Sequence, residues 1–246
     1  MKAVTFLINT GNRLISLAAG LLMVLFLLYG GYALWDTVML YQGAFISGDL
    51  MKYKPSVQEK EDGKSLEELM KINPDVRGWL TIDGTHIDYP VVQGETDMEY
   101  INTDVYGEFA LSGSIFLDSQ NKGDFSDSYS LLYGHHMANG AMFGDVMHFV
   151  GEDYFKEHQT GRIFFTEGRN AEIDIFACME TDAYDRRIYY PEFCDSTNMK
   201  ELLTYIQENA VWYRKIGIKE SDRLIGLSTC AEAETNGRVL IFGRLK

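Results

Sequence analysis

Cysteine is scarce in this chain, and basic side chains are fewer than acidic ones. Three cysteines occur among 246 residues, at positions 178, 194 and 230. Their spacings fit neither a disulfide framework nor a zinc site, although the sequence leaves a bridge between Cys178 and Cys194 open. The 22 lysines and arginines stand against 36 aspartates and glutamates and form no basic stripe, so we expect no nucleic-acid partner. Internal repeats and low-complexity tracts are also absent.

One long stretch near the N-terminus has no charged residue at all. Residues 14–35 carry neither acid nor base, and residues 1–13 before them carry Lys2 and Arg13 but no acid. A helix of this length spans roughly 33 Å at about 1.5 Å per residue, which is enough to cross a bilayer. The apolar part of a cleaved signal peptide is shorter, at about 7–15 residues. We therefore predict a retained transmembrane anchor at 14–35, with residues 1–13 in the cytoplasm and the rest of the chain outside.

The remaining chain divides into a spacer and one domain. Residues 36–64 combine a helical continuation of the anchor with a polar segment that has little to bury, so we expect a juxtamembrane spacer. Ser65 and Glu68 form a capping-box pattern, which predicts a helix from Ser65 to about Ile72. The domain then covers residues 65–246, about 180 residues, enough for one sizeable core.

Short strand patterns dominate this domain. Eight are separated by glycines and polar turns, at 79–83, 86–92, 114–118, 129–134, 161–167, 171–180, 223–230 and 238–245. Helical patterns interrupt the series at 96–102, 142–157 and 196–214. Such a series is typical of a closed β-barrel. We predict a mostly-β fold, an eight-stranded closed barrel with peripheral helices, preceded by one transmembrane helix.

Three residues with complementary chemistry fall at predicted strand ends. Cys230 ends the apolar run 224–230, Arg238 follows eight residues later at the start of the next run, and His135 follows the strand 129–134. A free thiol at neutral pH is only a few per cent thiolate, so a cysteine nucleophile needs a base such as histidine. An arginine keeps its charge and can bind a developing oxyanion. We predict Cys230 as nucleophile, His135 as acid and base, and Arg238 as electrostatic stabiliser.

Neighbouring residues leave alternatives open. Each of the three residues alone also has an ordinary structural interpretation, as a small buried thiol, a surface polar group or a solvated charge. His136 adjoins His135, and neighbours on a strand point to opposite faces, so the residues alone do not decide which one acts. Ser228, Thr229 and the backbone amide of Ala231 are predicted to bind substrate.

Several segments, in this order along the chain, resemble the signature segments of sortases, most closely those of class B. They cover roughly residues 65–246 and read NPDVRGWL at 73–80, IDYPVVQ at 87–93, GSIFLD at 113–118, YGHH at 133–136 followed by MFG at 142–144, and LSTC at 227–230 with the trailing Arg238. The resemblance selects His135, directly after Gly134, as the base.

The resemblance also implies a function. It implies a membrane-anchored cysteine transpeptidase of Gram-positive bacteria with an extracellular catalytic domain at 65–246. Such an enzyme would cleave surface proteins after the threonine of an Asn-Pro-X-Thr or Ser-Pro-X-Thr sorting motif, form a thioacyl enzyme, and transfer the protein to an amine of a cell-wall peptide cross-bridge or its lipid-linked precursor. No metal or organic cofactor is called for. The alternatives are a pilin-polymerising sortase that uses a protein lysine, and a non-enzymatic peptide-binding surface protein.

Overall fold

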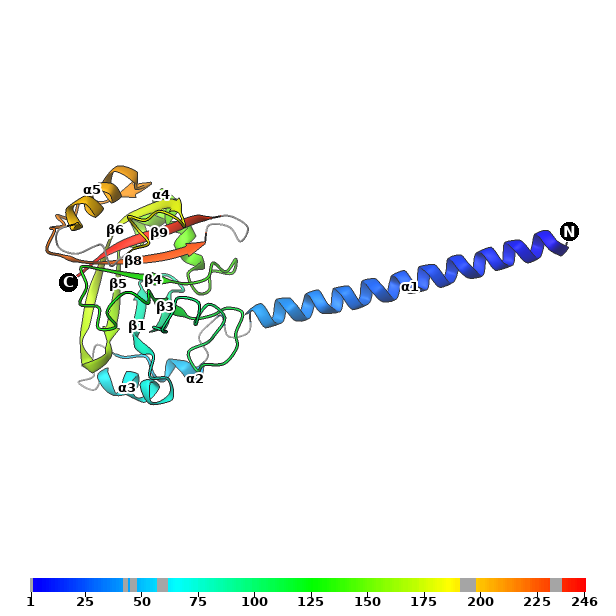
Figure 1. The fold of residues 1–246 in the computed structure, drawn as a ribbon, viewed down its shortest axis with the longest axis horizontal. Helices are drawn as coiled ribbons and strands as arrows, with labels where there is room; N and C mark the ends of the chain where they lie inside the picture. The colour runs from blue at the N-terminus through cyan, green and yellow to red at the C-terminus, as the bar shows by residue number, and fades with distance from the viewer. Residues whose placement is uncertain (1, 42–43, 45–47, 57–61, 191–197, 231–235) are drawn as a thin grey trace. The chain divides into compact units, whose positions relative to one another are not determined.

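The computed structural model describes residues 2–41, 44, 48–56, 62–190, 198–230 and 236–246. The chain forms two compact units, Met1–Tyr41 and Gln42–Lys246, which we describe separately. The first is a single helix, α1 (Lys2–Tyr41), and its apolar side chains are exposed along its length. Residues Val4–Met39 are long and apolar enough to cross a membrane, which makes α1 a candidate membrane anchor (Figure 1).

The second unit is built on the predicted closed barrel of eight strands. Neighbouring strands pair in the order β5-β1-β2-β3-β4-β8-β9-β6, and β6 pairs with β5 to close the ring. The barrel strands are β1 (Val76–Ile82), β2 (Asp88–Val92), β3 (Ile115–Leu117), β4 (Tyr129–Tyr133), β5 (Thr160–Phe165), β6 (Asn170–Asp182), β8 (Arg223–Cys230) and β9 (Gly237–Leu245). Each of the eight overlaps a predicted strand, with ends that differ by at most three residues. A ninth strand, β7 (Trp212–Tyr213), pairs with Ala177 and Cys178 of β6. The predicted helix at 196–214 was therefore wrong at its C-terminal end, since the helix there, α5 (Met199–Asn209), ends before β7.

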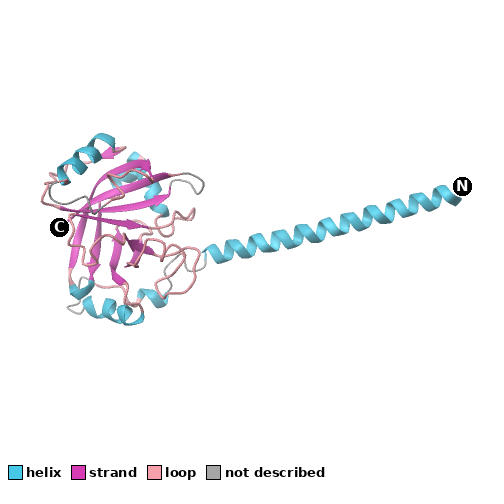
Figure 2. Cartoon of the chain, viewed as in Figure 1, coloured by secondary structure: helices cyan, strands magenta, loops and turns pink. Residues whose placement is uncertain are grey.

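Helices lie at the periphery of the barrel (Figure 2). They are α2 (Gly48–Met51), α3 (Asp62–Ile72), the 3₁₀ helices η1 (Gly144–Val150) and η2 (Thr166–Gly168), α4 (Glu152–Glu157) and α5 (Met199–Asn209). α5 packs beside β6 and α3 beside β1, on different sides of the ring (Figure 1). The predicted helix start at Ser65 was wrong, since α3 begins at Asp62.

The predicted helix at 96–102 was also wrong, since this segment consists of turns. Its polar groups bond to a distant loop instead of to the next helical turn. The backbone amide of Ser119 donates to the Asp97 carboxylate over 2.7 Å, and the amide of Ser114 donates to the carbonyl of Tyr100 over 3.1 Å. These long-range bonds override the local helical pattern.

Part of the segment expected as a spacer packs on the barrel. Leu50 and Tyr53 are buried in a core cluster that contains Trp79 of β1. Lys54 forms an ion pair with Asp88 of β2, with 2.6 Å between Nζ and Oδ2. The two apolar side chains stand in a short, mostly polar stretch, so no sequence pattern indicated their burial. The folded unit therefore includes residues before Ser65.

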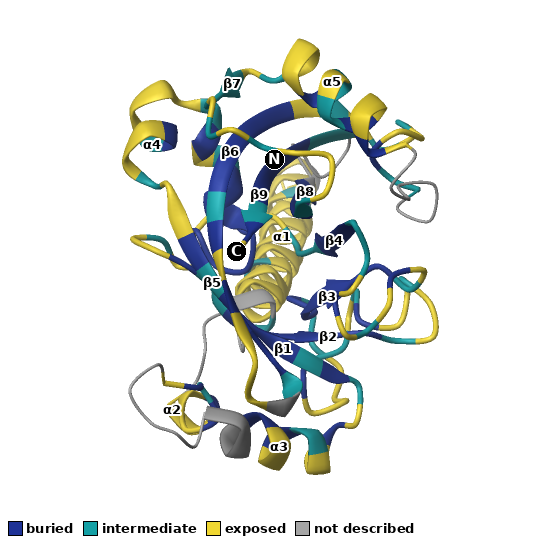
Figure 3. Ribbon diagram, turned by 90° about the vertical axis from the view of Figure 1, so that its left-hand side faces the viewer, coloured by how far each residue is buried: buried dark blue, intermediate teal, exposed yellow. Residues whose placement is uncertain are grey.

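Two parallel strand pairs determine which ends of the strands meet. The pairs β2–β3 and β4–β8 are parallel, and the other pairs of the ring are antiparallel. Because β4 and β8 run the same way, their carboxyl ends meet at one edge, with Tyr133 beside Ser228. The strands of the ring are largely buried, whereas the outer faces of α4 and α5 are exposed (Figure 3). This edge carries the predicted functional residues.

Candidate active site

His135 lies just beyond the end of β4. The amide of Gly134 donates to the carbonyl of Ser228 over 3.2 Å, which continues the contact between β4 and β8 up to the histidine. Gly134 has no room for a side chain, because an added Cβ would collide with the side chains of Ile115 and Phe143. His135 Nε2 lies 2.7 Å from the carbonyl oxygen of Ile101. Since a carbonyl only accepts, Nε2 carries the proton of the neutral ring, and Nδ1 is left as the proton acceptor.

Cys230 and Arg238 face each other across the last strand pair. Cys230 ends β8, Arg238 is the second residue of β9, and the antiparallel register makes the two residues direct partners. Direct partners are nearest neighbours in a sheet. The guanidinium of Arg238 is half-buried and donates from Nη1 to the carbonyl of Gly237 over 2.9 Å. The register therefore places Cys230 directly beside Arg238, whose guanidinium is permanently charged.

A cavity of about 480 Å³ opens at this edge of the barrel. Among the described residues, twelve line it: Asp97, Met98, Ile101, Phe116, Tyr133, Gly134, His135, Ala183, Tyr189, Ser228, Thr229 and Arg238. Four residues predicted from the sequence, His135, Ser228, Thr229 and Arg238, therefore line the same cavity. Of these, Thr229 directly precedes Cys230 in the chain. Ala231, also predicted, lies outside the described residues. Sequence reasoning missed the aromatic and aliphatic side chains that form most of the wall.

Comparison with known proteins identifies the family. A family model described as the sortase domain matches residues 80–246. This chain belongs to the sortase family. It is 35% identical over 185 residues to Sortase B of Listeria monocytogenes, a match that covers 73% of each sequence. Sortase B of Staphylococcus aureus is 29% identical over 181 residues, with the same coverage.

Solved structures agree with this assignment. Spy0129, a Streptococcus pyogenes class B sortase involved in pilus biogenesis, is 44% identical with a TM-score of 0.68, and the match covers 73% of this chain and 97% of that one. A mutant form of Clostridium perfringens sortase B is 29% identical with a TM-score of 0.73, over 80% and 96% of the two chains. The chain is a class B sortase, a cysteine transpeptidase, and the peptide-binding surface protein without activity is excluded.

An aromatic wall forms one side of the sortase cavity. Tyr133 and Tyr189 stack with ring centroids 6.3 Å apart at 15°, and Phe116 lies 5.3 Å from Tyr133. The hydroxyl of Tyr133 donates to the buried Asp118 carboxylate over 2.7 Å. Burial, and after it the charge of Asp118, raise the pKa of Tyr133, so the phenol stays protonated. The wall therefore offers a flat apolar surface, and the hydroxyl of Tyr133 is already hydrogen-bonded to Asp118.

The two predicted hydroxyl residues differ in their surroundings. Ser228 Oγ lies 2.9 Å from the hydroxyl of Tyr189, so it is part of the wall. Thr229 Oγ1 is buried, and it has no hydrogen-bond partner among the described residues. A buried hydroxyl without a partner carries a free-energy cost that a bound substrate can relieve. Of the two, Thr229 is the better candidate for a bond to substrate.

His136 lies in a different environment from His135. It forms an isolated antiparallel bridge with Met142, and it is not among the described residues that line the cavity. Burial, followed by the nearby His148, lowers the pKa of His136. The bridge with Met142 gives His136 a structural part in the loop that follows His135.

Cys178 is a free thiol in the core of the barrel. It is fully buried in β6, and burial raises its pKa to about 12, so it stays protonated at neutral pH. This state makes it inert as a nucleophile. The bridge to Cys194 that the sequence left open concerns a partner outside the described residues. Within the described part of the chain, no group of three or more His, Cys, Asp or Glu side chains is placed to hold a metal ion.

Proposed function

We propose that Cys230 is the nucleophile of this sortase, His135 its acid and base, and Arg238 its electrostatic stabiliser. The observation that carries the proposal is the strand register. β8 pairs Cys230 with Arg238 on one side and Ser228 with Tyr133, two residues before His135, on the other. Residues from β4, β8 and β9 are thereby gathered around one cavity at one edge of the barrel.

The proposed reaction has two steps. In the first, the thiol of Cys230 gives its proton to Nδ1 of His135, and the resulting thiolate attacks the threonine carbonyl of a sorting motif and forms a C–S bond, while Arg238 stabilises the oxyanion. The C–N bond then breaks, and His135 gives a proton to the leaving amine. In the second step an acceptor amine attacks the thioacyl carbon and loses its proton to His135, and the C–S bond breaks to restore Cys230.

The substrate we propose is a surface protein with an Asn-Pro-X-Thr or Ser-Pro-X-Thr sorting motif. Resemblance to class B sortases supports this motif, and so does the cavity, since a proline ring packs well against the flat wall of Tyr133 and Tyr189. One solved relative is a Staphylococcus aureus sortase B–substrate complex, which is 27% identical and has a TM-score of 0.69.

The proposed acceptor is an amine of the cell-wall peptide cross-bridge or of its lipid-linked precursor. A protein lysine is the second candidate, and one observation favours it. Spy0129, which is 44% identical to this chain, is involved in pilus biogenesis, and a sortase B from a type II pilus of Streptococcus pneumoniae is 37% identical. Either acceptor would attack the same thioacyl carbon through an amine. The two differ in the molecule that carries this amine, a cell-wall peptide or a second protein.

Mass spectrometry of the reaction products tests substrate and acceptor together. The enzyme is incubated with a library of sorting peptides and with two amines, a cell-wall cross-bridge peptide and a lysine-bearing pilin segment. We expect cleavage after threonine and a new amide to the cross-bridge amine. Transfer to the lysine alone would establish the pilin alternative, and cleavage at another position would overturn the proposed motif.

We also propose that α1 anchors the enzyme in the membrane, with residues 14–35 spanning it, residues 1–13 in the cytoplasm and the catalytic unit outside. The uncharged span and its preceding Lys2 and Arg13 support this orientation. An external protease added to intact protoplasts should digest a C-terminal tag and spare an N-terminal one. Digestion of the N-terminal tag and protection of the C-terminal tag in intact protoplasts would reverse the orientation.

We expect Arg238→Lys to lower kcat by about 10²–10³-fold, with a smaller change in KM. Lysine keeps the positive charge but lacks the planar fork that holds an oxyanion in fixed geometry. The measurement is steady-state cleavage of a fluorogenic sorting peptide. Arg223→Lys is the matched control, because Arg223 is also half-buried and bonds a carbonyl, that of Phe125, but lies at the opposite end of β8. Turnover of Arg238→Lys close to that of the control would show that catalysis does not need the planar guanidinium, and Arg238 would then be a charge contributor or a bystander.

A further inference from the structure

The hydroxyl of Tyr89 joins two segments that are far apart in the sequence. It donates to the carbonyl of Ala44 over 2.9 Å and accepts from the backbone amide of Met142 over 2.9 Å. Tyr89 lies on β2 and is 5% exposed. Burial raises its pKa to about 12, so the phenol keeps the proton that it donates to Ala44. One buried hydroxyl therefore satisfies two backbone groups at once.

The Met142 end of this link belongs to the loop that begins at His135. The amide of Phe143 donates to the carbonyl of His135 over 3.0 Å, and Met142 pairs with His136. Met142 has a φ of 54°, in the left-handed region that a methionine rarely adopts. Its amide donates to the Tyr89 hydroxyl, and a buried amide that loses its acceptor destabilises the folded state. The Tyr89 hydroxyl thus fixes the returning arm of the loop that carries His135.

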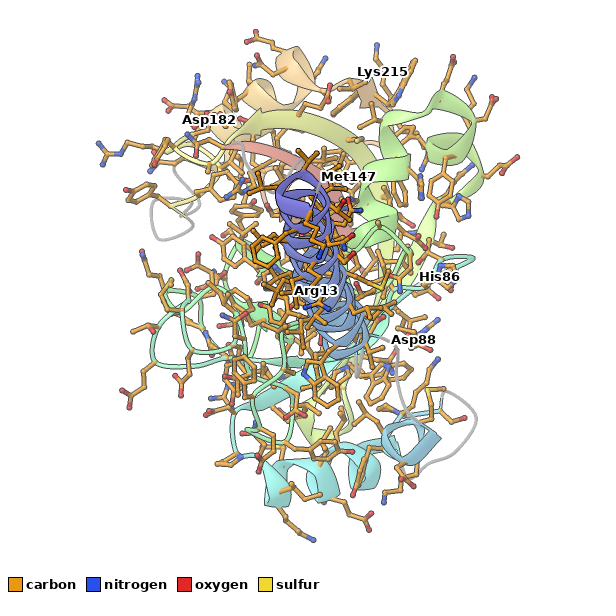
Figure 4. The ribbon with its side chains drawn as sticks, turned by 90° about the vertical axis from the view of Figure 1, so that its right-hand side faces the viewer. Arg13, His86, Asp88, Met147, Asp182 and Lys215 are labelled. Carbon is orange, nitrogen blue, oxygen red and sulfur yellow. The ribbon has the colours of Figure 1, made fainter. Side chains whose placement is uncertain are left out.

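The Ala44 end belongs to the segment that follows α1. Residues 44–54 are part of the spacer expected at 36–64, and we call this part the juxtamembrane segment. The structure describes residues 44 and 48–54 of it. Ala44 is fully buried, and Leu50 and Tyr53 pack in the core with Trp79. Asp88, the residue before Tyr89, holds Lys54 and accepts from the indole of Trp79 over 2.8 Å. Figure 4 shows Asp88 on the same side of the barrel as His86. Adjacent residues of β2 therefore fasten both ends of this segment.

We infer that Tyr89 is a positioning residue for His135, and that it makes the geometry of the active site depend on the juxtamembrane segment. The inference rests on the proposed role of His135. Tyr89 is not among the described residues that line the cavity, so it acts through the Met142 amide and not on substrate. Its loss should alter proton transfer at His135 and leave the peptide-binding wall intact.

The test compares Tyr89→Phe with Trp212→Phe in the full chain, purified in detergent. Trp212 is the control, since its indole also bonds a backbone group, by donating to the carbonyl of Val150 over 2.7 Å, and neither residue is among the described residues that line the cavity. We expect kcat of Tyr89→Phe to fall by about 10–100-fold, as a small misplacement of a catalytic group can cause. KM should stay within about twofold, and both variants should lose similar thermal stability.

A second pair of variants tests the juxtamembrane segment itself. Lys54→Met removes the ion pair with Asp88, whereas Lys156→Met removes an exposed pair with Glu152 on α4. We expect kcat to fall several-fold in the first and to stay unchanged in the second. Equal kcat values for this pair would overturn the link to the segment.

The His135→Ala variant, measured alongside, separates this inference from the proposed function. If His135→Ala is inactive and Tyr89→Phe turns over like its control, the positioning role of Tyr89 is wrong. If His135→Ala turns over normally, the assignment of the base is wrong instead.

Discussion

Replacing Cys230 by alanine is expected to abolish both cleavage of the sorting peptide and transfer to an amine. Loss of a covalent nucleophile typically lowers kcat by about 10⁴-fold or more. The strand register leaves Arg238 and the end of β4 in place, so the variant should fold and still bind peptide. Cleavage is followed with a fluorogenic peptide, and intact-protein mass spectrometry detects the thioacyl adduct, which should form on the wild type alone.

Cys178→Ala is the matched control for this variant. Cys178 is also a strand cysteine, but it is fully buried and its pKa is raised to about 12, so the control should keep kcat. A methanethiosulfonate reagent should likewise inactivate the wild type by modifying Cys230 and leave Cys178 unmodified in the folded protein. An acyl adduct on Cys230→Ala would show that the nucleophile lies elsewhere.

His135→Ala should lose nearly all activity, by about 10²–10⁴-fold in kcat, as expected for a general acid–base group. His135 lines the cavity, and its bond from Nε2 to the carbonyl of Ile101 fixes the ring with Nδ1 as acceptor. The measurement is kcat of both cleavage and amine transfer for the folded variant, since both steps move a proton.

His136→Ala provides the comparison within the same dipeptide. His136 pairs with Met142 in the loop, and its lowered pKa keeps it mostly neutral at pH 7. This variant should retain a measurable part of the activity and lose some through the loosened loop. Equal and complete losses in two folded variants would contradict the choice of His135.

The barrel could be predicted from the sequence because its strands are short runs of strand-forming residues bounded by glycines and polar turns. The pattern failed where long-range contacts decide the backbone. Asp97 and Tyr100 have a helical sequence context, yet their bonds to Ser119 and Ser114 hold them in turns. The burial of Leu50 and Tyr53 in the expected spacer likewise depends on Trp79, which comes much later in the chain.

The three catalytic residues could be proposed from the sequence because their chemistry is distinctive and they fall at the ends of predicted strands. The aromatic wall could not. Tyr189 lies in a connection without any motif, and only the closed barrel brings it to Tyr133 and Ser228. The same holds for Tyr89, whose hydroxyl bonds Ala44 and therefore a segment that no local pattern linked to the site.

The parallel pairing of β4 with β8 also has a consequence for how the protein folds. Tyr129 pairs with Leu224, and β5, β6, β7 and α5 all lie in the chain between the two strands that lead to His135 and Cys230. Contacts between such distant segments form slowly, because the entropy of closing a long loop is lost before the contacts compensate for it. The catalytic centre should therefore assemble among the last steps of folding. Until then a newly made chain carries an ordinary, weakly reactive thiol, which limits premature acylation and wrong disulfides before the enzyme is complete.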